Sequence, residues 1–469
     1  MNKYFTTFKD IDTYNSFVAS AEIPNINVSY ITDSDEVKYF KEHVSQTPFT
    51  LEIVSLPEGM TEIPFALCLA GWAPDGFAWP TARIKYSKDN GTTWSRWYEK
   101  VVSYGDPVMN FDGELILHEG DKVMFIGENI FHIERFFVDI DMQGGDVKGN
   151  VSGNPCSFFF GDDFTFKTFS DYGMETPYGQ DPWGEYSSPF HNMFNLETIR
   201  FKVIDAGDLW LPGTYLPDGV FDKMFFGQDE LISAPNIYAK YLPERACENM
   251  FLGCSALTTM PDIYTTTFGK ANALDYMFKN CSSLVTTTPL RVNHIESNED
   301  WQRLFVSTFE NCTSLTTTPQ FSLSQIEDVK GTRFIIDSTF KDCVSLTNCT
   351  WELDSDIFGH NIDPQAGFNY VFQNCSSLTT APIIRANASY PWCEYPYEGC
   401  TSLSTIFYLV DTWEAGSMGN FTSDISTLPS TGTLVLADGV SQDGWLGYKV
   451  PATWTIKTWS EYHQGEINA

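Results

Sequence analysis

Basic residues are scarce in this chain of 469 residues, which has 28 Lys and Arg against 61 Asp and Glu and a net charge of −33. A chain this acidic repels phosphate groups, so neither nucleic acid nor an anionic membrane surface is an expected partner. We interpret the acidity as a means of solubility. A surface for divalent cations or for a basic partner is the alternative.

Other absences exclude further classes of protein. No apolar run reaches the length of about 18 residues that a bilayer-spanning helix needs, so no membrane span is predicted. The segment Met1–Asp10 lacks the apolar stretch of a secretory signal, so export by the usual route is not expected. No Cys-x-x-Cys pair occurs and the seven histidines are scattered, so we expect no metal site and no cofactor.

The chain does contain one short phrase six times: an aromatic residue, then Cys three positions later, then Leu three positions after that. The copies are Phe251, Cys254 and Leu257; Phe278, Cys281 and Leu284; Phe309, Cys312 and Leu315; Phe340, Cys343 and Leu346; Phe372, Cys375 and Leu378; and Tyr397, Cys400 and Leu403. The steps between cysteines are 27, 31, 31, 32 and 25 residues. A period of about 20 to 50 residues is typical of a solenoid, because each unit can bury its apolar face only against its neighbours.

The spacing within the phrase indicates what each residue does. Residues three apart share one face of a short helical turn, so the aromatic residue and Cys are expected to point into the core together, followed by Leu. The Thr-rich run after Leu favours a strand. Six of the eleven cysteines occupy the repeat position, which leaves two interpretations: a disulfide framework, or a column of buried thiols. The single cysteine per repeat and the odd total favour the buried column, so these residues are predicted to be structural.

The solenoid is predicted to begin near residue 190 and to have seven or eight turns. Phe225, Gln228 and Leu231 form a degenerate copy with Gln in place of Cys, and Met193–Leu196 begins a still more divergent one. Prolines seven or eight residues after the cysteines are expected to close each strand: Pro261, Pro289, Pro319 and Pro382. Insertions between repeats, such as 291–300, are expected on one face, which is often the binding face.

The N-terminal part is predicted to be β structure. Two alternating runs, 27–31 and 36–39, predict a hairpin that docks on another domain or chain. From 49 to 160 we expect a β-sandwich-like domain of short strands. Its strands include 49–54 and two hairpins: 83–87 with 92–94 around Asn90-Gly91, and 114–117 with 122–126. The segment 156–160 is expected to be the last strand of this domain or the first rung of the solenoid.

Two further segments complete the predicted organisation. The Gly-, Pro- and Tyr-rich stretch 161–192 is predicted to be a long loop that either binds sugar or packs on the end of the solenoid. Residues 411–469, with strands at 432–436 and 451–456, are predicted to form a small β cap. The predicted fold class is therefore mainly β with short helices. The predicted domains are an attachment segment at 1–48, a sandwich-like domain at 49–160, a repeat solenoid with its preceding loop at 161–410 and clear repeats from 225, and a cap at 411–469.

The phrase Met277–Leu284 and its copies resemble the BspA-like class of leucine-rich repeats, in which an aromatic residue, Gly-Cys or Asn-Cys and a Ser/Thr-rich Leu segment recur before a proline. Residues 84–94 are similar to a β domain found ahead of such repeats, and 432–456 to the segment that closes them. The arrangement is similar to proteins of gut Bacteroidetes and of their crAss-like phages. The resemblance implies a solenoid core built from the repeat residues, with no catalytic residue.

We expect from this a non-enzymatic virion protein, a head fibre, tail fibre or decoration protein. It would attach to other virion proteins through 1–48 and bind a host surface glycan or protein through the solenoid. A homotrimer on the virion surface, assembled in the host cytoplasm, is the expected state. The alternatives are a bacterial cell-surface adhesin with the same repeats, and a fibre-borne glycan-degrading enzyme. Among 61 acidic residues some carboxylate pair always fits a glycosidase, so that signal has no specificity.

Overall fold

The computed structural model describes most residues of the chain. These are 28–33, 36–41, 45–71, 81–101, 108–129, 133–137, 146–165, 188, 190–197, 200–213, 216–269, 272–290, 294–295, 301–303, 305–320, 333–349, 351–353, 368–386, 394–410, 425–447 and 449–467. Strands account for 29% of the structure and helices for 6%, with a β-solenoid of about six turns between residues 237 and 458. The predicted mainly-β class and the solenoid are thereby confirmed. The solenoid has about six turns between 237 and 458, and not the seven or eight turns expected from residue 190 onward.

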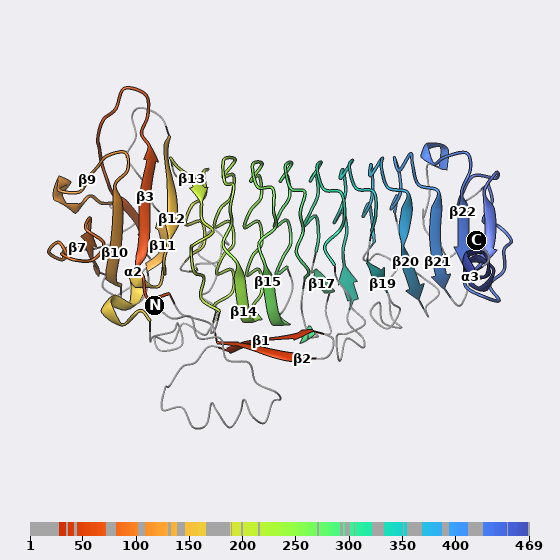
Figure 1. The fold of residues 1–469 in the computed structure, drawn as a ribbon, viewed down its shortest axis with the longest axis horizontal. Helices are drawn as coiled ribbons and strands as arrows, with labels where there is room; N and C mark the ends of the chain where they lie inside the picture. The colour runs from red at the N-terminus through yellow and green to blue at the C-terminus, as the bar shows by residue number, and fades with distance from the viewer. Residues whose placement is uncertain are drawn as a thin grey trace. The chain divides into compact units, whose positions relative to one another are not determined.

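The chain divides into two compact units, which are described separately. The first comprises 1–246 and 261–267, and the second comprises 247–260 and 268–469. In the first unit, six strands form one sheet in the order β13-β12-β3-β10-β6-β7 (Figure 1). Their bounds are Phe49–Ser55 (β3), Thr81–Ser87 (β6), Tyr98–Val101 (β7), Lys122–Asn129 (β10), Val147–Ser152 (β12) and Phe201–Asp205 (β13).

Smaller elements surround this sheet. A second sheet holds β11 (Ile133–Phe137), β5 (Leu67–Gly71) and β8 (Val108–Met109), and β4 (Ile63–Pro64) pairs with β9 (Ile116–Leu117). The strands β1 (Val28–Asp33) and β2 (Glu36–Lys41) form the expected antiparallel hairpin. The sandwich arrangement of the larger sheets stays a prediction. Three short helical segments complete the region: η1 (Phe111–Gly113), α2 (Ser157–Phe160) and η2 (Gly161–Asp163).

Three local predictions for this region are wrong. The partner of β6 is β7, not 92–94, because the carboxylate of Asp89 holds the backbone N–H and hydroxyl of Thr93 in the loop. The Asn90-Gly91 turn itself has the positive φ angles expected, 56° and 80°. Residues 114–117 and 122–126 do not pair, since β9 binds β4 while β10 lies between β3 and β6. The segment 156–160 is a helical turn, because Phe160 N–H bonds back to the Cys156 carbonyl.

The large sheet continues directly into the first coils. Its outer strand β13 pairs in parallel with β12, whereas the other neighbours in this sheet are antiparallel. Parallel pairing is the pattern of stacked coils, in which each strand repeats the direction of the one before. The bridge from Asp205 to Ser233 is also parallel. Further along, β14 (Ile237–Leu242) and β15 (Ile263–Phe268) are neighbours in one sheet, with Tyr238 and Tyr264 stacked 5.2 Å apart.

The second unit holds the later coils. Five parallel strands lie side by side in the order β19 (Glu352–Leu353), β20 (Thr380–Ala386), β21 (Thr405–Val410), β22 (Thr433–Leu436) and β23 (Thr455–Thr458) (Figure 1). Shorter elements are β16 (His294–Ile295), β17 (Trp301–Arg303), β18 (Arg333–Ile335) and η5 (Ile425–Thr427). No helix in the described part of the chain is long and apolar enough to cross a membrane.

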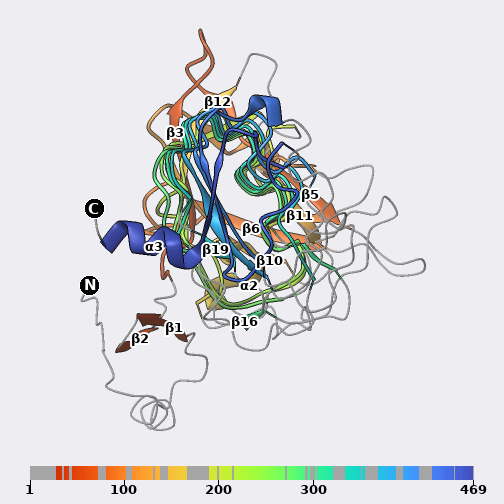
Figure 2. The ribbon, with the colours of Figure 1, turned by 90° about the vertical axis from the view of Figure 1, so that its right-hand side faces the viewer.

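The C-terminal segment differs from its prediction. Its two strands, β22 and β23, were expected to belong to a small β cap that covers the last rung, but they continue the parallel sheet and extend the solenoid to residue 458. The helix α3 (Trp459–Ile467) comes directly after β23 and lies to one side of the strands (Figure 2). Its Trp459 and Tyr462 pack on a cluster that contains Phe407 and Val435. The last strand of the solenoid is thus followed by a helix that packs beside the sheet.

The prolines do not close the strands as predicted. Pro261 precedes β15, Pro382 lies inside β20, and Pro289 and Pro319 lie in irregular segments. Proline lacks a backbone N–H and is tolerated in a strand only where the pairing is interrupted. The register between β20 and β21 shifts between Thr380 and Ile383, at the position of Pro382.

Candidate functional site

The aromatic residues of the repeat form a continuous column in the second unit. Adjacent ring centroids from Phe251 to Phe372 lie 5.5 Å apart, and Phe372 lies 5.9 Å from Tyr397. The planes of neighbouring rings differ by only 8° to 14°. In the first unit Phe194 and Phe225 stack in the same way at 5.2 Å. The aromatic position of the repeat is thus a packing position that keeps successive coils in register.

The repeat cysteines form a second column beside the rings. Five of the six thiols donate a hydrogen bond to the carbonyl oxygen of the aromatic residue one coil earlier, at 3.0 to 3.2 Å. The bonds run from Cys281 to Phe251, Cys312 to Phe278, Cys343 to Phe309, Cys375 to Phe340 and Cys400 to Phe372. All eighteen residues of the six phrases are at most 1% exposed. The repeat cysteines are therefore both core residues and links between coils.

The leucines occupy the third position of the phrase and are completely buried. In each copy the leucine N–H bonds to the carbonyl of the cysteine three residues earlier, at 3.0 or 3.1 Å. The chain thus makes a further tight turn before it becomes extended, and this turn directs the leucine side chain into the core. The six residues are Leu257, Leu284, Leu315, Leu346, Leu378 and Leu403. Their role is packing, as it is for the aromatic residues.

This environment removes the reactivity of the thiols. Burial raises the pKa of Cys281, Cys312, Cys343 and Cys375 far above the usual range and that of Cys400 to about 12. Only the thiolate acts as a nucleophile or a metal ligand. The nine cysteines whose side chains the structure describes are thiols and not disulfides, and the described residues hold no group of His, Cys, Asp and Glu that could bind a metal ion. The repeat cysteines are therefore buried scaffold residues.

The residue before each cysteine has a special backbone conformation. Its φ angle is positive in all six repeats: Gly253 (81°), Asn280 (65°), Asn311 (61°), Asp342 (62°), Asn374 (62°) and Gly399 (76°). Residues other than Gly, Asn and Asp rarely adopt this left-handed backbone conformation. The Gly-Cys and Asn-Cys pairs of the sequence are its signal, and the sequence reasoning did not use it.

The left-handed residue also corrects the expectation of a short helical turn. Cys281 N–H bonds to the carbonyl of Phe278 three residues earlier, as in a tight turn, while Asn280 N–H bonds to Glu310 in the next coil. Along this segment the N–H groups alternate: one bonds within its own coil, and the next one bonds to the neighbouring coil. In an α-helix, all of these N–H groups would point along the helix axis and would bond within the segment itself. The segment is a ribbon of turns that joins coil to coil through its backbone.

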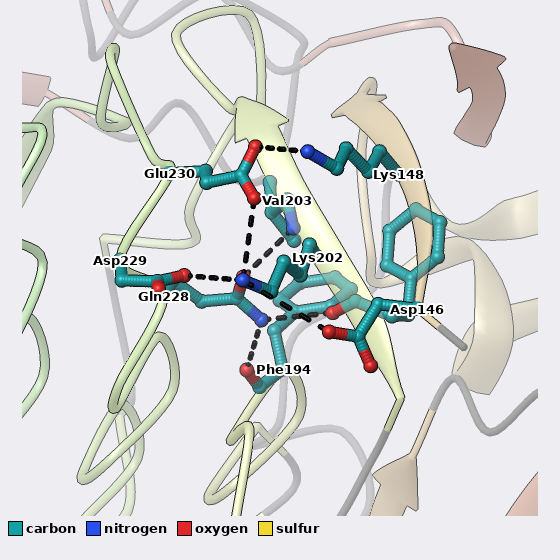
Figure 3. A network of polar contacts seen from close by, with 9 residues as sticks. Asp146, Lys148, Phe194, Lys202, Val203, Gln228, Asp229 and Glu230 are labelled. Carbon is teal, nitrogen blue, oxygen red and sulfur yellow. Dashed lines mark hydrogen bonds and ion pairs between the residues drawn. The ribbon is translucent and has the colours of Figure 1, made fainter. Parts of the chain in front are cut away.

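Gln228 occupies the cysteine position of the degenerate repeat and makes more bonds than a thiol could. Its side-chain amide donates to the carbonyls of Phe194 and Phe201 at 2.7 and 3.0 Å. Its amide oxygen accepts the N–H of Val203 at 2.7 Å. Figure 3 shows Gln228 pointing toward Phe194 and Val203. The bond to Phe194 is equivalent to the thiol bonds of later coils, and the other two fix β13.

A charged network lies close to Gln228 in the first unit (Figure 3). Lys202 on β13 contacts Asp229 at 2.9 Å, Glu230 at 3.2 Å and Asp146 at 3.9 Å, and Lys148 on β12 contacts Glu230 at 2.6 Å (Figure 3). Burial alone would lower the pKa of Lys202, but the bonds to Asp229 and Glu230 outweigh it and raise the pKa. The bond from Lys148 lowers the pKa of Glu230. This network ties β12, β13 and the coil of the degenerate repeat together.

A buried carboxylate occupies the second unit. Asp275 is fully buried, accepts the N–H of Val306 at 2.9 Å and lies 3.3 Å from the guanidinium of Arg303. Burial raises its pKa to about 7, with a smaller contribution from the negative charge of Glu248, although Arg303 and the Val306 bond oppose the shift. A group with this pKa titrates near neutrality, but its partners all belong to the scaffold, which gives it a structural role.

The surface after the repeat Leu is rich in hydroxyl groups and carries no charge. The first residue after each Leu is Thr258, Val285, Thr316, Thr347, Thr379 or Ser404, and all six are exposed. Their hydroxyls bond along the stack from Thr347 to the Thr316 carbonyl at 3.1 Å, from Thr379 to Thr347 at 3.3 Å, and from Ser404 to Thr379 at 3.2 Å. We call these six positions the hydroxyl row, although one of them, Val285, carries no hydroxyl. It is an ordered, uncharged surface on a strongly acidic protein.

The segments predicted to carry recognition lie largely outside the described residues. This holds for most of the insertion 291–300, most of the loop 161–192 and most of the attachment segment 1–48. The structure therefore brings the repeat residues together, and the roles of these three segments stay predictions.

A scan against protein-family models finds no match to this chain, and a search of the curated proteins finds none either.

Proposed function

We propose that this protein is a non-enzymatic virion protein, a head fibre, tail fibre or decoration protein, with a solenoid of the BspA-like leucine-rich-repeat type as a rigid recognition scaffold. The observation that carries the proposal is the burial of every repeat residue in columns that link coil to coil. Such columns fix the backbone without using the outward side chains. A rigid array of outward residues is suited to binding a large partner, because little conformational entropy is lost on association.

The outward surface supports a host surface glycan or protein as the partner. The hydroxyl row presents uncharged hydrogen-bonding groups on a chain of net charge −33, where a polyanion would be repelled. The attachment segment 1–48 would hold the protein to other virion proteins, and a homotrimer is the proposed assembly. These assignments extend the resemblance of the repeats to proteins of crAss-like phages.

The test of the virion assignment is mass spectrometry of purified particles. The protein is expected in the particle fraction after density-gradient purification, at a constant ratio to the major capsid protein. Deletion of 1–48 should release the rest of the chain into the soluble fraction while its circular dichroism stays native. Absence of the protein from purified particles would refute the assignment.

Host attachment is tested with the purified protein on host cells. The variant Thr316→Glu/Thr379→Glu adds two charges to the hydroxyl row and should weaken binding by about tenfold or more, because each carboxylate must be desolvated at the interface. Val101→Glu/Val108→Glu is the matched control, since it also adds two charges, at exposed positions on strands of the first unit. Equal loss for both variants would argue against the hydroxyl row as the binding surface.

The two alternatives give different outcomes. A bacterial cell-surface adhesin would be found in the membrane fraction of uninfected cells and not in particles. A glycan-degrading enzyme would release oligosaccharides from host capsule, and incubation followed by chromatography detects them.

A further inference from the structure

The thiols of the repeat have a role besides packing. We call them the ladder thiols: Cys254, Cys281, Cys312, Cys343, Cys375 and Cys400. Five of them donate their S–H to the carbonyl of the preceding coil, and that carbonyl also accepts the backbone N–H of the cysteine in its own coil. Oxidation of a thiol to a disulfide removes the S–H, so the second bond on this carbonyl is lost. The ladder is therefore complete only when the cysteines are reduced.

The ladder thiols are bonded to backbone carbonyls and not to one another. Five of them donate to the preceding coil, and all six are thiols and not disulfides in the structure. A disulfide between two neighbouring ladder cysteines would require their sulfur atoms to turn toward each other in a specific geometry. The bonds to the carbonyls, which join one coil to the next, would then be lost.

In the folded protein the thiols are protected. They are completely buried, and burial keeps them protonated by raising the pKa values. Thiol–disulfide exchange needs a thiolate with access to the oxidant. Neither condition holds in the stacked coils.

The unfolded chain has the opposite properties. Its thiols have an ordinary pKa of about 8.5, so a small fraction is thiolate at neutral pH. Consecutive ladder cysteines are 25 to 32 residues apart, and loops of this length close at a modest entropic cost. Exchange with one glutathione disulfide is balanced: two protein thiols form one disulfide, two glutathione molecules leave as thiols, and the two protons pass to them.

We infer that the ladder makes folding of the solenoid dependent on redox state in one direction: the chain must fold with its cysteines reduced, and the folded coils then resist oxidation. The protein therefore has to fold in a compartment that keeps thiols reduced, and it can afterwards function where disulfides form. This inference does not depend on the partner that the solenoid binds.

The experiment unfolds the full-length protein in guanidinium and refolds it by dilution, either with dithiothreitol or with a mixture of glutathione and glutathione disulfide. Near-ultraviolet circular dichroism and size-exclusion chromatography measure the native yield. The yield is expected to fall by at least about tenfold in the glutathione mixture. Native protein placed in the same mixture should keep both its spectrum and its six ladder thiols, counted by alkylation and mass spectrometry.

A control variant carries Ala at the other five cysteines, Cys68, Cys156, Cys247, Cys349 and Cys393. It should show the same dependence as the natural sequence. Should this variant fail to fold, peptide mapping of the oxidised natural protein decides: disulfides that include ladder cysteines support the inference, and disulfides confined to the other five overturn it. Equal refolding yields in the two buffers, or rapid reaction of the ladder thiols in native protein, would also overturn it.

Discussion

Two left-handed residues in each repeat accompany the bonds between coils. The residue before each cysteine has a positive φ, and so does the residue two positions before each aromatic residue, such as Tyr276. Their N–H groups bond to the next coil, for example from Asn280 to Glu310 and from Tyr276 to Val306. At Gly399 the space is also tight, because a Cβ atom there would lie 2.3 Å from the Asn374 side-chain oxygen and 3.1 Å from its Cα, so Asn374 would have to shift. The choice among Gly, Asn and Asp at this position follows from conformation and from the space left by the preceding coil.

Replacement of Asn280 tests the left-handed position. We expect Asn280→Val to lower the free energy of unfolding by about 1 to 3 kcal/mol, because a β-branched residue is strained at a φ angle of 65°. Asn280→Gly is the matched control. It loses the same bond from Asn311 but keeps the backbone unstrained, so it should cost no more than about 1 kcal/mol. Urea unfolding compares the two, and equal losses would contradict the conformational explanation.

Replacement of Cys312 tests the thiol bond. We expect Cys312→Ser to destabilise the protein by about 1 to 3 kcal/mol, since it buries a hydroxyl in an apolar column. Oxygen lies closer to Cβ than sulfur does, so the hydroxyl can reach the Phe278 carbonyl only through a stretched bond. The urea midpoint measures the loss. An unchanged midpoint would mean that serine fits the ladder as well as cysteine.

The titration of Asp275 gives stability a specific pH dependence. Its pKa is raised from 3.8 to about 7 in the fold, so between these values the folded protein binds more protons than the unfolded chain. Stability contributed by this group is therefore present below about pH 4 and is lost as pH rises toward 7. We expect Asp275→Asn to lack this contribution. Between pH 5 and pH 7.5 the free energy of unfolding of the natural protein should fall by about 1 to 3 kcal/mol relative to that of the variant, as measured by urea unfolding. A constant difference would show that the pKa is not raised.

At the scale of the element, one side chain joins a strand of the large sheet to the coils. Gln228 fixes β13 through Val203 and Phe201 and bonds the preceding coil at Phe194. Gln228→Leu keeps the volume but leaves three backbone groups without this partner, and we expect it to cost about 3 to 5 kcal/mol. Gln228→Glu restores the acceptor for Val203 and is the comparison. Hydrogen exchange of β13 should accelerate in the leucine variant, and unchanged exchange would contradict the role assigned to Gln228.

The elements were predictable where the pattern is local and repeated. The repeat phrase predicted the aromatic, Cys and Leu columns, and alternation predicted β3 and the hairpin of β1 and β2. The pairing of β9 with β4 and of β22 with β23 was not predicted. Strand alternation identifies which face of a strand is buried but not which strand lies beside it, because that choice depends on residues distant in the sequence.

At the scale of the whole molecule, charge opposes the compact state. With a net charge of −33, repulsion between carboxylates is strong at low ionic strength and is screened over about 10 Å at 0.1 M salt. We expect the melting temperature to rise by several degrees between about 10 and 150 mM sodium chloride. Sodium sulfate at equal ionic strength separates screening from a specific chloride effect. A melting temperature that falls with salt would show that surface ion pairs outweigh the repulsion.

The sequence by itself determined the repeat, its core positions and the mainly-β class, because a unit that buries its apolar residues only against copies of itself must stack. Only the tertiary structure decided how the coils are joined: the thiol bonds, the left-handed turns, the parallel continuation through β23 and the place of Gln228 in the ladder. Each of these depends on a backbone group one coil away, and the distance along the chain to that group is not fixed by any local pattern. Periodicity identifies the residues that face inward, and the hydrogen bonds between coils determine which partner each one meets.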